Sequence, residues 1–100
     1  MRKPYRSYEE SLIKSLKDKK EAQLYLNAAL EEGDKESFLL ALYHVAKAHG
    51  LSRLAEKAKL HRVSLHKMLS KEGNPEFESI LRLIQASGFR LVIKAQAKAA

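Results

Sequence analysis

The side chains best suited to chemistry in this 100-residue chain are basic and hydrogen-bonding, and they gather in the stretch LSRLAEKAKLHRVSLHKMLSK at positions 51–71. Residues 47–71 hold seven Lys or Arg and one acidic residue, whereas residues 1–46 hold eight of each sign. Ammonium and guanidinium groups contact phosphate oxygens, and Arg also recognises the edge of guanine through two parallel hydrogen bonds. A general role of the charge in solubility would not explain its localisation, so the stretch predicts a DNA interface.

The other polar residues do not form a catalytic or metal-binding pattern. The four histidines form two pairs, His44/His49 and His61/His66. A spacing of five residues does not place two imidazoles on one helical face, as a spacing of four would. The acidic pairs are Glu9/Glu10 and Glu31/Glu32. Adjacent carboxylates point apart on a helix, and four glycines without cysteine provide neither a phosphate-binding loop nor a thiolate site. We therefore expect no enzyme activity, no metal and no cofactor.

Two short helices joined by a tight turn are predicted to position the basic residues. Apolar residues at helical spacing give each helix one buried stripe: Leu54, Ala55, Ala58, Leu60, Leu65 and Met68. Ala55 is expected where the two helices approach most closely, because a steep crossing leaves room only for a small side chain.

The same register predicts the residues of a helix-turn-helix that would face DNA. Six residues on the outward face of the second helix are expected to reach base edges in the major groove: His61, Arg62, Val63, His66, Lys67 and Ser70. Four flanking basic residues are expected to contact phosphates: Arg53, Lys57, Lys59 and Lys71.

Capping residues divide the first fifty positions into three expected helices. The first covers residues 7–16 and repeats Tyr8, Leu12 and Leu16 at helical spacing. The expected cap and stop residues of the next two helices are Asp18 and Gly33, then Asp34 and Gly50.

A further helix and a strand are expected after residue 73. Asn74 as a cap and Pro75 at the first helical position predict a helix that ends at Gly88. Its expected inward residues are Phe77, Ile80, Leu81 and Ile84. The period then changes to two, which predicts a short strand. With no partner strand in the chain, we expect it to pair with a second copy in a homodimer through Phe89, Leu91 and Ile93.

Length and composition predict one small domain. A hundred residues with 45% hydrophobic content can enclose one modest core. The longest apolar runs, such as residues 38–42, are too short to cross a membrane, and the first ten residues lack the apolar centre of a signal peptide. We expect a cytoplasmic protein without a membrane partner.

Two segments resemble the probable addiction-module antidote family, whose members are small antitoxins with a Cro/cI-type (lambda repressor-like) DNA-binding domain. They are YLNAALEEGDKESFLLALYHVAKAHGLSRLAEKAKL and SLHKMLSKEGNPEFESILRLIQASGFRL. The resemblance runs from about Tyr5 to Ile93, and the YLNAALEEGD block and the EGNP turn make it specific. Two residues depart from the usual pattern: Lys59 stands where the turn usually has Gly, and His61 stands where the second helix usually has a Ser cap.

The resemblance and the expected helices together predict an all-α, lambda repressor-like fold with a short C-terminal strand. An N-terminal helical segment over residues 1–33 would precede the helix-turn-helix domain over residues 34–94, and a tail over residues 95–100 would follow it.

The resemblance implies the antitoxin of a type II toxin–antitoxin module. Such a protein neutralises a RelE/ParE-type toxin and represses the shared operon as a DNA-bound dimer. The expected toxin surface is the neutral N-terminal stripe of Tyr8, Leu12 and Leu16, although this stripe would equally suit packing on the chain's own core. The alternative function is a stand-alone, phage-type transcriptional regulator without a toxin partner, and the neighbouring gene would distinguish the two.

Overall fold

The computed structural model describes residues 4–97 of the chain and their side chains from Tyr8 onward. Six α-helices follow one another in this range: α1 (Pro4–Ser15), α2 (Lys19–Glu32), α3 (Lys35–His49), α4 (Leu51–Ala58), α5 (Arg62–Met68) and α6 (Phe77–Ala86). The expected all-helical fold is therefore confirmed. Residues 1–3 of the expected N-terminal segment and residues 98–100 of the expected tail lie outside the described range.

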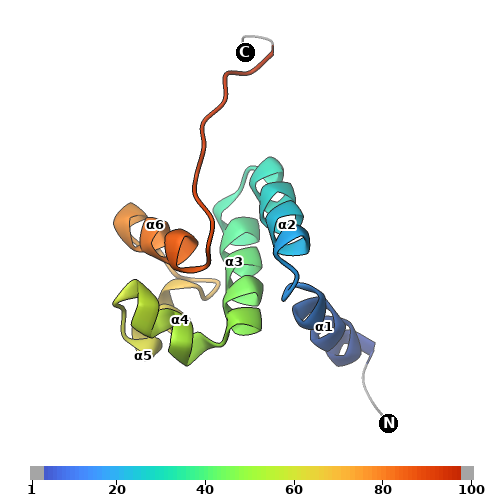
Figure 1. Ribbon diagram of the computed structural model, residues 1–100, viewed down its shortest axis with the longest axis vertical. Coiled ribbons are helices and arrows are strands. Elements are labelled where there is room, and N and C mark those ends of the chain that lie inside the picture. Colours follow the sequence, from blue (N-terminus) through green and yellow to red (C-terminus); the bar gives the residue numbers. More distant parts are fainter. Residues whose placement is uncertain (1–3, 98–100) are drawn as a thin grey trace.

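Helix α3 lies at the centre of the molecule (Figure 1). Helices α1 and α2 pack against it on one side, and α4 packs against it on the other. Helix α4 also contacts α5 and α6. The position of α5 therefore depends on α4, and the position of α4 depends on α3.

One hydrophobic core runs through all of these helices. Its fully buried side chains come from α3, α4, α5 and α6: Leu42, Val45, Leu54, Leu65 and Leu83. Leu16, which follows α1, and Leu26 of α2 belong to the same core. Each such leucine stabilises the fold by about 1.5–3 kcal/mol relative to leaving it in water.

The predicted caps of α2 and α3 are confirmed. The carboxylate of Asp18 accepts a hydrogen bond from the backbone N–H of Lys20 at 2.8 Å. Gly33 ends α2 in the left-handed conformation, with φ of 83°. Asp34 accepts from the backbone N–H of Ser37 at 2.9 Å, and this hydrogen bond is the main reason that the pKa of Asp34 is lowered. Short-range hydrogen bonds thus fix where these helices begin and end.

The turn between α4 and α5 is a Schellman motif centred on Lys59. The backbone N–H of Leu60 donates to the carbonyl of Ala55 at 2.8 Å, and that of Lys59 donates to the carbonyl of Glu56 at 3.2 Å. Lys59 has φ of 59° and ψ of 47° and is the one non-glycine residue with positive φ in the described part of the chain. The departure from Gly noted in the sequence thus falls on a left-handed position, and Leu60 packs on the core as the motif's apolar residue.

The predicted start of α6 is wrong by two residues. The helix begins at Phe77 after the N-cap residue Glu76, so Asn74 is not its cap and Pro75 is not its first residue. The backbone at Gly73 passes so close to the end of α5 that a Cβ atom there would overlap the carbonyl oxygen of Met68. Glu76 has extended backbone angles, with φ of −68° and ψ of 149°, so the helix begins only at Phe77.

The inward face of α6 differs in part from the predicted one, and Leu81 is only half-buried. Ile80 and Ile84 are buried as expected, but Phe77 is 65% exposed and Leu83 is fully buried in its place. Gly88, the predicted stop, has φ of 92° directly after the last turn.

The predicted C-terminal strand is not observed in the described range, where residues 89–97 have no regular secondary structure. The backbone N–H of Phe89 donates to the carbonyl of Ile84 at 3.0 Å, and that of Gly88 donates to the carbonyl of Gln85. These two bonds form a second Schellman motif, in which Phe89 packs back on the core. The first apolar residue of the alternating pattern therefore belongs to a helix end, and the following segment extends alone past α2 (Figure 1).

The strain at Lys59 can be measured by replacing it with glycine. Lys59→Gly should raise the melting temperature by a few degrees, because a left-handed non-glycine residue costs ~1–2 kcal/mol, which exceeds glycine's larger unfolded-state entropy. The matched control is Lys57→Gly, two residues earlier within α4, which should lower stability by ~0.5–1 kcal/mol. Thermal unfolding followed by circular dichroism measures both, and a fall for both variants would show that Lys59 is unstrained.

Candidate nucleic-acid interface

Helices α4 and α5 differ in how much of their surface they bury. Helix α4 buries Leu54, Ala55 and Ala58. Helix α5 has only seven residues and buries Leu65, with Leu69 buried directly after its end. Met68 packs partly against the core, and the other five side chains of α5 are exposed.

All six residues predicted to read bases are exposed: His61, Arg62, Val63, His66, Lys67 and Ser70. The apolar side chain of Val63 is 78% exposed. His61 is the N-cap of α5 and makes no side-chain capping hydrogen bond. The structure thus brings these side chains onto one projecting helix and its two ends.

Ser70 lies in the turn beyond α5, not on the helix itself. Its hydroxyl donates to the carbonyl of Lys67 at 2.7 Å and so closes the last turn. The hydroxyl proton is committed to this bond, and the oxygen keeps its lone pairs as acceptors.

The four residues predicted to contact phosphates are also exposed: Arg53, Lys57, Lys59 and Lys71. Lys57 differs from the other three because it lines a cavity of about 270 Å³ together with Ala48 of α3 and Ala86 of α6. Among the described side chains, no carboxylate forms an ion pair with a basic residue of the 47–71 stretch. Their positive charge is therefore available to an anionic partner.

Two residues of α3 lie beside α5 but were not among the residues that the sequence predicted to face DNA. The ring of Tyr43 meets the His66 ring edge-on, with centroids 5.9 Å apart. The ammonium of Lys47 lies 5.4 Å from the centroid of the same Tyr43 ring. The available sequence signals were their spacing of four residues on one helix face and the position of Lys47 at the start of the basic stretch.

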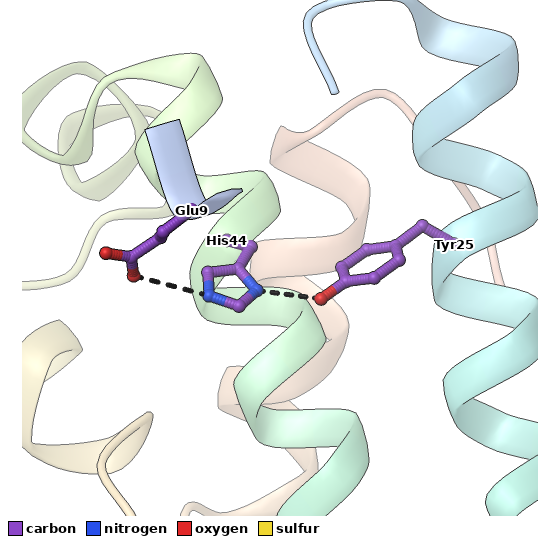
Figure 2. Close-up of polar contacts among 3 residues, drawn as sticks. All are labelled: Glu9, Tyr25 and His44. Atoms are coloured by element: carbon purple, nitrogen blue, oxygen red, sulfur yellow. Dashed lines mark hydrogen bonds and ion pairs between the residues drawn. The ribbon is translucent and has the colours of Figure 1, made fainter. Parts of the chain in front are cut away.

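Next to Tyr43 on α3, a polar cluster joins three helices (Figure 2), and the ring of its His44 lies 6.2 Å from the Tyr43 ring, centroid to centroid. His44 is buried, with its Nδ1 2.7 Å from the Tyr25 hydroxyl and its Nε2 3.5 Å from a carboxylate oxygen of Glu9. A carboxylate only accepts hydrogen bonds, so Nε2 carries the proton and the Tyr25 hydroxyl donates to Nδ1. Burial raises the pKa of Tyr25, which keeps it a phenol. The cluster holds α1 and α2 against α3.

The predicted toxin-binding stripe does not form one surface. Tyr8 is 68% exposed, whereas Leu12 is half-buried and Leu16 is a buried core residue. Leu16 follows the last residue of α1 and is 5% exposed within the hydrophobic core. Leu16 thus has no surface to offer to a partner in this fold.

The predicted dimer residues fall on the extended C-terminal segment. Phe89 packs on the core, while Leu91 is 41% exposed and Ile93 is 94% exposed. The segment and α2 line a groove of about 810 Å³ whose apolar walls include Leu26, Leu30 and Phe38.

Neither a metal-binding cluster nor a membrane-spanning helix is found among the described residues. Within the described residues, no three His, Asp or Glu side chains are grouped so that they could hold a metal ion. His49 is also engaged, since its Nε2 donates to the carbonyl of Ser87 at 3.3 Å. No helix in the described range is long and apolar enough to cross a membrane.

An all-helical domain with an exposed basic helix after a tight turn is compatible with a helix-turn-helix protein. The family described as "Probable addiction module antidote protein" matches residues 8–95 of the chain. An uncharacterized protein of Haemophilus influenzae strain Rd is 35% identical over 79 residues, which cover 79% of this chain and 81% of that protein. The chain therefore belongs to the addiction module antidote family. No solved structure matches it.

The polar cluster predicts how stability depends on pH. Burial is the main cause of the lowered pKa of His44, and it outweighs Glu9, which favours the charged imidazole, while nearby Lys47 lowers the pKa further. The unfolded chain then binds a proton more readily than the folded chain. This contribution to stability is complete above the ordinary pKa of 6.5 and is lost as the pH falls through the lower folded value.

Denaturant unfolding between pH 7.5 and pH 5 should accordingly show stability decreasing with acidity, and His44→Gln should flatten that slope. The matched control is His61→Gln, which removes an exposed histidine and should leave the slope as it is. A steeper slope for His44→Gln, or stability that rises with acidity in the unmodified protein, would mean that attraction to Glu9 dominates over burial.

Proposed function

We propose that this protein is the antitoxin of a type II toxin–antitoxin module and represses its own operon by binding operator DNA. The observation that carries the proposal is the projecting α5 helix with its turn, whose exposed basic side chains have no carboxylate partners among the described residues. In residues 1–46, by contrast, the eight basic residues are balanced by eight acidic residues. A repressor acts where the chromosome is, so we propose a cytoplasmic location.

In the proposed complex, residues 34–94 form a Cro/cI-type DNA-binding domain and α5 enters the major groove. Arg62, in the first turn of α5, would donate two hydrogen bonds to guanine, and exposed Val63 would pack against a thymine methyl group. His66 and Lys67 follow one turn later. Arg53, Lys59 and Lys71 are suited to the flanking phosphates.

DNA binding is tested by substituting Arg62. Arg62→Ala should weaken operator binding by ~1–3 kcal/mol and relax base preference at one position in each half-site. The matched control is Lys59→Ala, which removes one positive charge from the turn. It should weaken binding to all DNA sequences alike, because a phosphate contact carries no sequence information. Gel-shift titrations against the DNA upstream of the gene and against a scrambled duplex measure both. If wild type and Arg62→Ala prefer the operator over the scrambled duplex to the same extent, Arg62 does not contact a base.

We further propose that the protein binds DNA as a homodimer. Two copies of a helix-turn-helix would place their α5 helices about one DNA turn apart, roughly 34 Å, on a palindromic site. The extended segment after Phe89 exposes Leu91, Val92 and Ile93 next to an apolar groove, and this surface supports a contact between copies. Phe89 contributes less to it, because its ring already packs on the core.

The proposed second partner is a RelE/ParE-type toxin. The antidote family implies a toxin in general, and within the expected segment of residues 1–33 the helices α1 and α2 lie on the side of α3 away from α5. Tyr8 is the exposed apolar anchor of α1, and aromatic anchors often dominate protein interfaces. Half-buried Leu12 would contact the toxin at the edge of this interface, whereas Leu16 is buried in the core and takes no part in it.

A single substitution tests this surface. Tyr8→Asp should reduce toxin binding at least tenfold without unfolding the protein, because 68% of Tyr8 is already exposed. The matched control is Phe77→Asp on α6, where an aromatic residue of similar exposure lies on another helix. The measurement is co-purification with the product of the adjacent gene. Failure of the wild-type protein to retain that product would favour a stand-alone, phage-type regulator, and retention by Tyr8→Asp would move the interface elsewhere.

A further inference from the structure

We propose that α3 contributes to the DNA interface: Lys47 contacts a backbone phosphate, and Tyr43 is the positioning residue that holds Lys47 and His66 in place. The inference rests on the proposed DNA-binding function. It adds to that function an anchor on another helix, outside the helix-turn-helix of α4 and α5.

The first argument is placement. Tyr43 lies half-buried on α3 and turns its ring toward α5, where it meets His66 with centroids 5.9 Å apart and an interplanar angle of 60°. The Lys47 ammonium lies 5.4 Å from the centroid of the same ring. One ring thus connects a lysine of α3 with a histidine on the exposed face of α5.

The second argument is charge. No described carboxylate forms an ion pair with Lys47, so its charge is not neutralised within the described chain. The negative face of an aromatic ring attracts an ammonium group but does not cancel its charge. A phosphate can therefore bind Lys47 without first displacing an acidic partner.

The third argument is order. A free lysine loses much rotational freedom when it binds a phosphate, which weakens the contact. Lys47 already rests beside Tyr43, so part of this loss occurs on folding. The edge contact likewise limits the orientations of the His66 imidazole. Tyr43 would therefore act on DNA through its two neighbours, on phosphate through Lys47 and on bases through His66.

The experiment compares Lys47→Gln with Lys35→Gln. Both changes remove one lysine charge from α3, and the two positions lie about 18 Å apart along the helix. Lys47→Gln should weaken operator and scrambled DNA equally, by several-fold at low salt, and should lower the slope of log affinity against log salt by about one. Lys35→Gln should change neither quantity.

The role of Tyr43 is separated by two substitutions. Tyr43→Leu removes the ring and should lower the salt slope as Lys47→Gln does, with an added loss of preference at the base nearest His66. Tyr43→Phe keeps the ring and should behave as wild type. If Tyr43→Phe instead matches Tyr43→Leu, the hydroxyl itself contacts DNA and the positioning role is overturned.

A measurement without DNA tests the geometry directly. In proton NMR of the free protein, the His66 imidazole signals should shift in Tyr43→Leu, because the ring current of Tyr43 is lost, and should stay in place in Lys35→Gln. Unchanged His66 signals in Tyr43→Leu would show that the rings do not meet.

The outcomes also separate this inference from the proposed function. If Arg62→Ala weakens operator binding while Lys47→Gln and Lys35→Gln behave alike, DNA binding stands and the role of α3 is overturned. If the wild-type protein binds neither the operator nor the scrambled duplex, the proposed function and this inference both fail. Melting curves of each variant confirm that the compared proteins are folded.

Discussion

The left-handed turn at Lys59 is the constraint on which the exposed helix depends. It ends α4, because the N–H of Leu60 returns to the carbonyl of Ala55, and the chain begins a new helix at Arg62 with Leu65 buried in the core. With Lys59 in a helical conformation, α4 would continue and Leu65 would not reach that site. The outward direction of Arg62, Val63 and His66 therefore follows from one pair of backbone angles and one buried leucine.

The turn is useful only because α4 is itself held firmly. Helix α4 contacts α3, and α3 is held from its other side by α1 and α2. The cluster of Glu9, His44 and Tyr25 adds polar contacts to that packing. No buried side-chain nitrogen or oxygen of the described residues, here or elsewhere, is left without a hydrogen-bond partner. The N-terminal helices are thus a structural support for α3 and, through it, for α4 and α5.

Local signals in the sequence predicted the ends of α2 and α3 well, whereas the first helix begins at Pro4 instead of residue 7 and the start of α6 was misplaced. Asp18, Gly33 and Asp34 act through neighbours within three residues, so their roles were visible in the sequence. The start of α6 was misplaced because the constraint at Gly73 comes from the end of α5. Phe89 was assigned to a strand because a Schellman motif also places an apolar residue after glycine, and alternation alone does not distinguish the two.

The prediction of surface residues was limited in the same way, because tertiary packing decides which side chains stay exposed. The apolar stripe of α1 was visible in the sequence, but which of its members face the core is decided by α3, and Leu16 proved to be inside. Tyr43 and Lys47 were missed because they approach His66 only after α3, α4 and α5 have packed. A strained Lys59 and a His61 without a capping bond each cost about 1 kcal/mol, modest against the 5–15 kcal/mol of a typical fold. In return, Lys59 adds a positive charge and His61 adds an imidazole with hydrogen-bonding nitrogens beside the proposed DNA face.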